Sequence, residues 1–218
     1  MGGKITLFSG PMGGNKTKEL VTRHRGNLSQ SRAILPDVDT RSGGALITHP
    51  DNGGVRQVEN RNVLIIQAGD PGMILEELGQ ALADGEVKQI IVDETNFWSP
   101  ALVAVLEEVA GMDVEVYAGG LLLDSNLEDF GATRKVGGIA GEVVQMFADC
   151  DGDEGQCDER ATYNYFKGVQ PGQVFVGGFQ NFGAACPDHY NDFREEYGLE
   201  PLPDEIVCSN RWEIIVDE

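Results

Sequence analysis

Apolar and polar residues follow two different rhythms along most of the chain. Short apolar runs rich in β-branched residues, typical of buried strands, occupy residues 5–8, 45–48, 63–67, 89–92 and 114–118. Longer segments with helix-like patterning occupy residues 16–26, 71–84 and 100–110. Because strands that alternate with helices form crossover units, the pattern predicts an α/β fold with a mainly parallel sheet covered by helices. Ligands of such sheets bind beyond the carboxyl ends of the strands.

The pattern changes after residue 141. The following residues are acidic and contain all four cysteines of the chain, scattered aromatic residues and glycine-rich turns. No repeat is evident at the periods of solenoid proteins. We therefore expect a larger domain over residues 1–141, a smaller one over residues 142–195 and a C-terminal tail over residues 196–218.

The chain carries a large negative charge. Its 218 residues include 36 acidic and 16 basic side chains, which gives a formal net charge of −20. This surplus opposes binding to a phosphate backbone, so we expect no polymeric nucleic acid as a partner. No apolar run approaches the roughly 20 residues of a membrane-spanning helix, and the N-terminus leads directly into a strand. We expect a cytoplasmic protein without a membrane partner.

A glycine-rich turn follows the first predicted strand directly. Residues 9–18 read Ser-Gly-Pro-Met-Gly-Gly-Asn-Lys-Thr-Lys and lead into the first predicted helix. Such a turn presents backbone N–H groups and the positive end of a helix dipole to a phosphate, while Lys16 adds a charge and Thr17 a hydroxyl for Mg²⁺. The strict phosphate-loop pattern has glycine where this chain has Asn15, which tolerates positive φ at a cost of roughly 1 kcal/mol. The alternative is an ordinary glycine-rich turn.

Two adjacent carboxylates end another predicted strand. Asp93 and Glu94 follow the apolar run at 89–92, at the edge of the sheet where a ligand is expected. In enzymes with a phosphate loop, one carboxylate here holds the metal that bridges the phosphates, and a neighbour can orient or deprotonate the nucleophile. The alternative is a solvated strand end, but the glycine-rich turn upstream favours a functional pair. The residues expected to bind ATP and Mg²⁺ are Gly10, Pro11, Met12, Gly13, Gly14, Asn15, Lys16, Thr17 and Asp93.

Three cysteines and a histidine form a second candidate site. Cys186 and His189 have the short spacing that lets two side chains reach one tetrahedral ion, and Cys150 and Cys157 complete a set of four. Four such ligands suit a structural Zn²⁺ and leave no open position for catalysis. The spacing of Cys150 and Cys157 along the sequence is wider than is usual for a pair of zinc ligands. The alternatives to a zinc site are free thiols or a disulfide. Cys208 lies outside this set.

Taken together, these motifs resemble the zinc-containing thymidine kinases, or type II deoxynucleoside kinases, over nearly the whole chain. The resemblance rests on the order of the phosphate loop, the carboxylate strand with its trailing aromatic residues, and a Val-Gly-Gly segment ahead of the last metal ligands. These residues are Gly10-Pro11-Met12 with Lys16-Thr17, Asp39-Thr40-Arg41 with Thr48-His49, Val92-Asp93-Glu94-Thr95-Asn96-Phe97-Trp98, Val176-Gly177-Gly178, and Cys186 with His189. The resemblance implies a P-loop, RecA-like domain with helices on both faces of the sheet. It also implies a small zinc-ribbon domain whose lasso closes over the nucleoside.

The resemblance further implies transfer of the ATP γ-phosphate to the 5′-hydroxyl of thymidine or a related pyrimidine deoxynucleoside. Lys16 would bind phosphate, Thr17 and Asp93 would hold Mg²⁺, and Glu94 would act as the base. Arg41 would neutralise charge on the transferred group. The family is generally tetrameric, so we expect a homotetramer. The residues implied for nucleoside binding are Met12, Phe97, Leu121, Ser125, Asn164, Phe175, Val176, Gly177 and Phe182.

Three positions depart from the family pattern at the base pocket. Ser125 stands where the family has an aromatic ring that packs on the base, Phe182 replaces a tyrosine, and Asn164 replaces a threonine near the 5-methyl group. Losing a stacking ring costs on the order of 1–3 kcal/mol per base. The departures therefore bear on the preferred base more than on the reaction class.

Two other functions would use many of the same residues. A P-loop ATPase without a nucleoside substrate would share the turn and the carboxylates, but it needs no nucleoside lid. A catalytically degenerate, acidic binding protein would fit Asn15, Ser125 and the negative charge, but it would show no Mg²⁺-dependent ATP binding.

Overall fold

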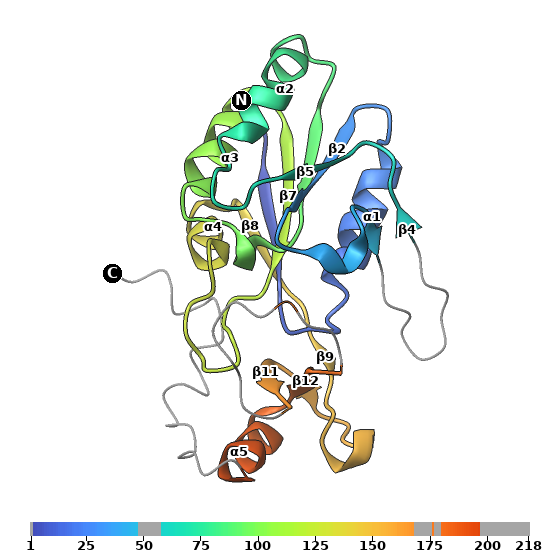
Figure 1. The fold of residues 1–218 in the computed structure, drawn as a ribbon, viewed down its shortest axis with the longest axis vertical. Helices are drawn as coiled ribbons and strands as arrows, with labels where there is room; N and C mark the ends of the chain where they lie inside the picture. The colour runs from blue at the N-terminus through green and yellow to red at the C-terminus, as the bar shows by residue number, and fades with distance from the viewer. Residues whose placement is uncertain (1, 48–57, 168–175, 177–179, 197–218) are drawn as a thin grey trace.

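The centre of the computed structural model is a six-stranded sheet (Figure 1). The structure describes residues 2–47, 58–167, 176 and 180–196. The strands lie in the order β5-β2-β6-β7-β1-β8, and every neighbouring pair is parallel, which confirms the predicted α/β sheet. The strands are β1 (Ile5–Ser9), β2 (Ser31–Pro36), β5 (Val63–Ile66), β6 (Gln89–Val92), β7 (Glu115–Gly120) and β8 (Glu142–Gln145).

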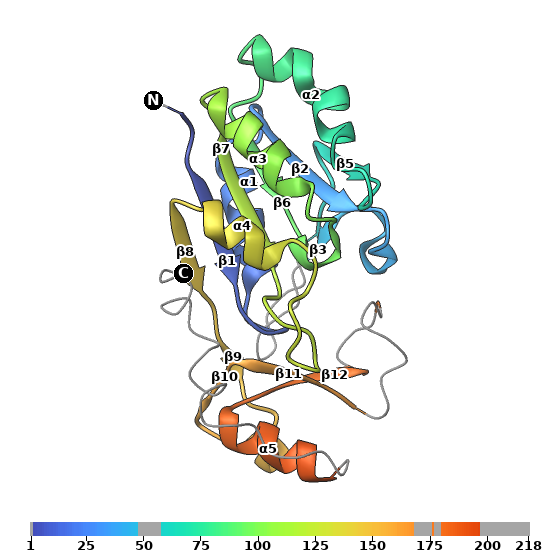
Figure 2. The same ribbon diagram turned by 90° about the vertical axis from the view of Figure 1, so that its left-hand side faces the viewer.

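Helices cover both faces of this sheet, as expected (Figures 1 and 2). Helix α1 lies on one face, and α2, α3 and α4 lie on the other. Neighbouring strand residues point to opposite sides, so Leu35 and Ile91 pack in the α1 core while Ile34 and Ile90 pack in the other. This double burial explains the continuous apolar runs. The helices here are α1 (Lys16–Gly26), α2 (Met73–Ala83), α3 (Leu102–Gly111), α4 (Thr133–Ile139) and the 3₁₀ turns η1 (Thr40–Ser42) and η2 (Thr95–Phe97).

One strand of the sheet differs from the sequence prediction. The pattern predicts a strand at 45–48 and none at 31–36, whereas Ser31–Pro36 forms β2 between β5 and β6. Leu46–Ile47 forms β3, which pairs antiparallel with β4 (Val58–Glu59) in a separate two-stranded sheet. The apolar centre of β2 is short, since two polar residues precede it and a proline ends it. Its sequence therefore has the pattern of a loop, and only pairing on both sides makes it a strand.

A smaller unit lies beyond the carboxyl ends of the sheet strands (Figure 2). Strand β8 still pairs with β1, so the main sheet continues four residues past the boundary predicted at 141. The small unit pairs β9 with β10 and β11 with β12, both antiparallel, and α5 packs against them. Its elements are β9 (Ala148–Asp149), η3 (Asp153–Gly155), β10 (Arg160–Ala161), β11 (Tyr163–Phe166), β12 (Phe182–Ala185) and α5 (Pro187–Glu196).

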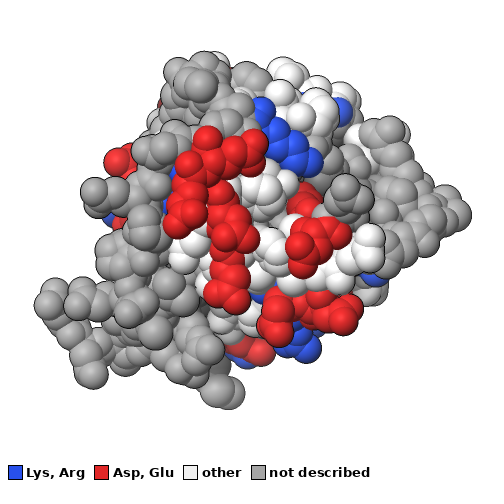
Figure 3. All heavy atoms as spheres, turned by 90° about the horizontal axis from the view of Figure 1, so that it is seen from below, with Lys and Arg blue, Asp and Glu red and all other residues white. Residues whose placement is uncertain are grey.

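Aromatic rings form the core of the small unit. The rings of Tyr163 and Tyr190 lie 4.9 Å apart between centroids, and those of Tyr165 and Phe193 stack at 4.0 Å. Acidic side chains are numerous on its outer face (Figure 3). Among the helices that the structure describes, none has the length and apolar character needed to cross a membrane. Nearly all of the predicted tail, residues 197–218, lies outside the described residues.

Candidate active site

The turn between β1 and α1 contains two residues with left-handed backbones and leads directly into the helix. Asn15 adopts a left-handed conformation with φ 62° and ψ 17°, and Gly13 has φ 79°. Asparagine thus takes the conformation expected of it, because it is one of the few residues other than glycine that tolerate this region. The carbonyl of Asn15 accepts the N–H of Glu19 at 3.1 Å, so α1 begins directly at the turn. The backbone N–H groups of the first helical turn therefore lie beside the loop.

Gly10 is required by a close approach of two backbones. A Cβ at this position would lie 2.2 Å from the carbonyl oxygen of Met146. Met146 donates its N–H to the carbonyl of Ser9 at 2.7 Å, which holds the chain leaving β8 against the start of the turn. Any side chain at Gly10 would force these segments apart.

Lys16 closes the turn from inside. Its Nζ donates to the carbonyl oxygens of Gly10 at 2.8 Å and of Pro11 at 2.6 Å. Burial lowers the pKa of Lys16 to about 8, although Glu94 and Asp93 favour its charged form. An ammonium group held only by two main-chain carbonyls can exchange them for an incoming phosphate, which offers a full negative charge in their place.

A hydrogen bond joins the turn to the carboxylate strand. Thr17 Oγ1 donates to Asp93 Oδ2 at 2.9 Å, although the two residues are 76 positions apart. Asp93 is 5% exposed at the end of β6. Burial, assisted by the charge of Glu94, raises the pKa of Asp93 to about 7, and the hydrogen bond from Thr17 opposes that rise. The glycine-rich turn and the acidic pair therefore meet at the carboxyl edge of the sheet.

Glu94 faces a fixed arginine. Its backbone is left-handed, with φ 54° and ψ 48°, a conformation that costs a non-glycine residue roughly 1–3 kcal/mol and is concentrated at functional sites. Glu94 Oε1 accepts a hydrogen bond from Arg41 Nη2 at 2.6 Å, while Asp39 accepts from Arg41 Nε at 2.6 Å. Although burial opposes it, the hydrogen bonds to Asp39 and the charge of Glu94 raise the pKa of Arg41. Arg41 is therefore a permanent cation beside Glu94.

The structure connects several of the predicted nucleoside residues to this centre. The N–H of Met12 donates to Asn164 Oδ1 at 2.7 Å, which ties the turn to β11 of the small unit. The ring of Phe97 meets that of Phe130 edge-on at 5.5 Å, and the guanidinium of Arg41 lies 6.0 Å from the Phe97 centroid. Phe97 and Met12 thus belong to the same edge of the sheet as the acidic pair.

Other predicted nucleoside residues are held mainly by the small unit. The carbonyl of Ser125 accepts a hydrogen bond from the hydroxyl of Tyr190 at 2.8 Å, and Phe182 begins β12. The side chains of Ser125 and Phe182 are half-buried, as is Val176. Two further predicted residues, Phe175 and Gly177, lie outside the described residues.

A cavity separates the turn from the segment that follows β7. Pro11, Asp124, Met146 and Asn164 are among the residues that line it. Asp124 Oδ1 accepts the N–H groups of its own turn, but Oδ2 is buried without a hydrogen-bond partner among the described residues.

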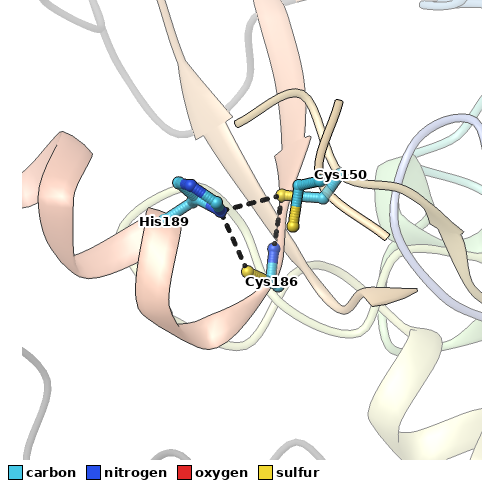
Figure 4. Close-up of side chains that lie close together, drawn as sticks. Cys150, Cys186 and His189 are labelled. Carbon is cyan, nitrogen blue, oxygen red and sulfur yellow. Dashed lines mark hydrogen bonds between the residues drawn. The ribbon is translucent and has the colours of Figure 1, made fainter. Parts of the chain in front are cut away.

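The predicted metal ligands converge in the small unit (Figure 4). The ligand atoms of Cys150, Cys157, Cys186 and His189 all lie within 4.8 Å of one another. His189 Nδ1 is 3.6 Å from the sulfur of Cys150 and 3.3 Å from that of Cys186. The three cysteines carry free thiols. Three sulfur atoms and one imidazole nitrogen at these separations are compatible with a tetrahedral Zn²⁺ site.

Surrounding groups orient these ligands. The N–H groups of Gly152 and Cys186 approach the sulfur of Cys150 at 3.4 Å and 3.2 Å. His189 Nε2 lies 3.3 Å from a carboxylate oxygen of Asp153, which favours the tautomer that leaves Nδ1 free to bind a metal. A Cβ at Gly152 would lie 2.2 Å from the His189 ring, so glycine is needed there.

Comparison with known proteins identifies the family. The family model described as thymidine kinase matches residues 3–190, which is most of the chain. The chain belongs to the thymidine kinase family. It is accordingly a deoxynucleoside kinase, a phosphotransferase that uses ATP and a small nucleoside, as the sequence resemblance implied.

Relatives from distant organisms give the same result. A thymidine kinase of Pseudothermotoga lettingae is 26% identical over 88% of this chain and 96% of its own length. A thymidine kinase of Thermococcus kodakarensis is 26% identical over 87% of this chain and 94% of its own length. A thymidine kinase of Bacteroides fragilis is 25% identical over 89% of this chain and 90% of its own length. The similarity to thymidine kinases therefore extends over both structural units.

Sequence reasoning missed one residue of this thymidine kinase-family site. Asn96, two positions after the acidic pair, accepts the N–H of Leu121 at 2.9 Å through Oδ1. Its Nδ2 donates to Glu94 Oε2 at 3.4 Å. The family resemblance covers Asn96 within residues 92–98 but gives it no role, because its two partners meet only in the folded chain.

Proposed function

We propose that the site formed by the Gly10–Thr17 turn and the Asp93–Glu94 pair transfers the γ-phosphate of ATP to the 5′-hydroxyl of thymidine or a related pyrimidine deoxynucleoside. The single observation that carries the proposal is the hydrogen bond from Thr17 to Asp93, with Glu94 and Arg41 directly beside it. Phosphoryl transfer depends mainly on positioning and on charge stabilisation, and this arrangement supplies groups for both.

ATP would bind in the turn. Lys16 and the backbone N–H groups at the start of α1 would hold the phosphates, with Lys16 leaving the carbonyls of Gly10 and Pro11 to do so. Thr17 and Asp93 fit Mg²⁺, since a hydroxyl and a carboxylate 2.9 Å apart offer the hard oxygen ligands that it prefers. When bound, Mg²⁺ would neutralise charge on the phosphates.

Glu94 would receive the proton of the attacking 5′-hydroxyl. Arg41 would stabilise charge on the transferred group, and its contacts with Asp39 hold it in place for this role. A loose, metaphosphate-like transition state is stabilised chiefly by such positioned cations.

The nucleoside would lie between the two units, against Met12, Phe97 and Leu121. Asn164, Ser125 and the lasso would enclose the base from the side of the small unit. A structural Zn²⁺ bound by the Cys₃His cluster would hold that unit together. The homotetramer and the cytoplasmic location stay predictions.

Family membership favours a kinase over the two other functions considered. A rate assay across the common deoxynucleosides with MgATP tests the choice directly. We expect phosphorylation of thymidine or another pyrimidine deoxynucleoside, and no ATP consumption when the nucleoside is left out. Turnover of none of the deoxynucleosides would reject the proposal, and ATP hydrolysis independent of nucleoside would support an ATPase instead.

Calorimetry with MgATP tests the phosphate-binding part separately. The wild-type protein should bind MgATP, and Lys16→Ala should lose most of that affinity because it removes the mobile charge from the turn. A wild-type protein that does not bind MgATP would point to an acidic binding protein.

A further inference from the structure

The segment η2 connects the proposed base to the chain that leads to the nucleoside. Asn96, at its centre, is only 2% exposed, and its side chain spans two partners. One is the N–H of Leu121, 2.9 Å from Oδ1, and the other is Oε2 of Glu94, 3.4 Å from Nδ2. A main-chain N–H requires the oxygen of the amide, which leaves the nitrogen to face the carboxylate. One side chain therefore contacts both the carboxylate and the nucleoside segment.

The backbone around Asn96 is clamped on its other side. A Cβ at Gly131, which has φ +56°, would lie 2.1 Å from the Asn96 carbonyl oxygen. The N–H of Ala132 donates to the carbonyl of Thr95 at 3.1 Å. These contacts hold the backbone of Asn96 in place, so the position from which its side-chain amide extends is fixed.

Glu94 is held at both of its oxygens. Arg41 donates to Oε1 at 2.6 Å, and Asn96 donates to Oε2 at the longer distance. These donors come from different parts of the chain. A carboxylate with a single partner can rotate about its bonds, whereas two donors on opposite oxygens fix its plane.

We propose that Asn96 is a positioning residue that sets the distance between Glu94 and the main chain at Leu121. In any one bound conformation, the 5′-hydroxyl of a nucleoside lies at a set distance from its base. A base that packs against Leu121 would therefore present its 5′-hydroxyl to Glu94 only if Asn96 holds Glu94 and the main chain at Leu121 at the matching distance. This proposal rests on the function proposed above, since it takes Glu94 as the base and Leu121 as part of the nucleoside site.

Two substitutions separate the contacts of Asn96. Asn96→Asp has nearly the same shape and keeps an acceptor for Leu121, but it loses the donor to Glu94 and places a like charge there. We expect its kcat for thymidine to fall about 10- to 100-fold, with KM for thymidine within about twofold of wild type. Asn96→Ala loses both contacts, so we expect the same fall in kcat and a rise in KM of about fivefold or more.

Thr133→Val is the matched control. It removes the buried 2.8 Å hydrogen bond between the hydroxyls of Thr95 and Thr133, and it leaves the contacts of Asn96 with Glu94 and Leu121 in place. We expect a lower Tm with wild-type kcat and KM. Circular dichroism checks that each variant is folded. If Asn96→Asp does not fold, Asn96→Ser is assayed in its place, with a lower kcat and a higher KM expected.

Wild-type kcat and KM in folded Asn96→Asp, or in Asn96→Ser where it is the variant assayed, would overturn the proposal. The proposal would also be overturned if the Asn96 variant changed kcat and KM no more than Thr133→Val does. Glu94→Gln, measured alongside, keeps the two proposals apart. If Glu94→Gln retains wild-type kcat, the function proposed for Glu94 is wrong. If Glu94→Gln is inactive while Asn96→Asp behaves as wild type, only the role of Asn96 is wrong.

Discussion

At the scale of single residues, several side chains of the site have backbone conformations or charges that reduce the stability of the protein when no ligand is bound. Asn15 and Glu94 both have left-handed backbones. Asp93 is buried and Lys16 is half-buried, and the loss of solvent shifts the pKa of each toward its neutral form. Such features persist where the surrounding structure enforces them and a ligand uses them.

Asn15 should be replaceable by glycine but not by alanine. Its side chain makes no capping hydrogen bond, so only the tolerance of φ 62° is at issue. We expect Asn15→Gly to keep wild-type stability and MgATP affinity, and Asn15→Ala to lose about 1 kcal/mol of unfolding free energy and bind MgATP more weakly. Urea unfolding and calorimetry measure these effects. An alanine variant equal to wild type in both would show that the left-handed turn is unimportant.

Asp93→Asn should stabilise the protein while it abolishes activity. Because the pKa of Asp93 is raised to about 7, the folded wild type binds a proton more readily than the unfolded chain, and its stability falls as pH rises through that value. An amide avoids this penalty, and the Thr17 hydroxyl can turn to accept from it. Without Mg²⁺ or nucleotide, we expect a gain of roughly 2 kcal/mol at pH 8 and a smaller gain at pH 5.

Urea unfolding at the two pH values measures the gain. The control is Asp70→Asn, at an exposed position, which should change stability little at either pH. An Asp93→Asn variant that is less stable than wild type at pH 8 would contradict the account of this carboxylate.

At the scale of elements, the sequence predicts those whose pattern is set locally. Helix α1 has the predicted bounds, and β6 follows directly from its apolar run. Strand β2 was missed because polar residues and a proline surround its short apolar centre, and α4 because it contains two glycines. These elements are stabilised by neighbours distant in sequence, which local periodicity does not report.

The junction of β1 and β8 should be sensitive to a single methyl group. Gly10→Ala would place its Cβ 2.2 Å from the Met146 carbonyl, so we expect a loss of about 2 kcal/mol or more and weaker MgATP binding. Gly79→Ala is the matched control, because no atom lies within 4 Å of its Cβ in the middle of α2. That variant should gain roughly 0.5–1 kcal/mol from helix propensity. Equal melting temperatures for the two variants would rule out the close approach.

At the scale of the whole molecule, two units meet at the carboxyl edge of one sheet. The order of the turn, the acidic pair and the Cys/His set was enough to predict which groups lie together in the fold, because each chemistry needs residue types that the sequence displays. The bridge made by Asn96 was not predictable in this way. Its partners are separated by 25 positions on one side and two on the other, and an amide has no distinguishing spacing.

Removing one metal ligand should loosen the small unit alone. We expect about one zinc ion per wild-type chain, and less in Cys157→Ser, as closed four-ligand sites require. Hydrogen exchange should then quicken in the 148–196 region and stay unchanged in the main sheet. Cys208→Ser is the control cysteine outside the cluster and should retain its zinc. Metal analysis that finds no zinc in the wild-type protein would remove this explanation of the small unit.

The most direct test of the central claim is to follow phosphorus by NMR in a mixture of the protein, thymidine and MgATP. We predict that a nucleoside 5′-monophosphate resonance grows in step with ADP, and that Glu94→Gln greatly slows both. The formation of ADP with inorganic phosphate alone, at a rate unaffected by thymidine, would contradict the account.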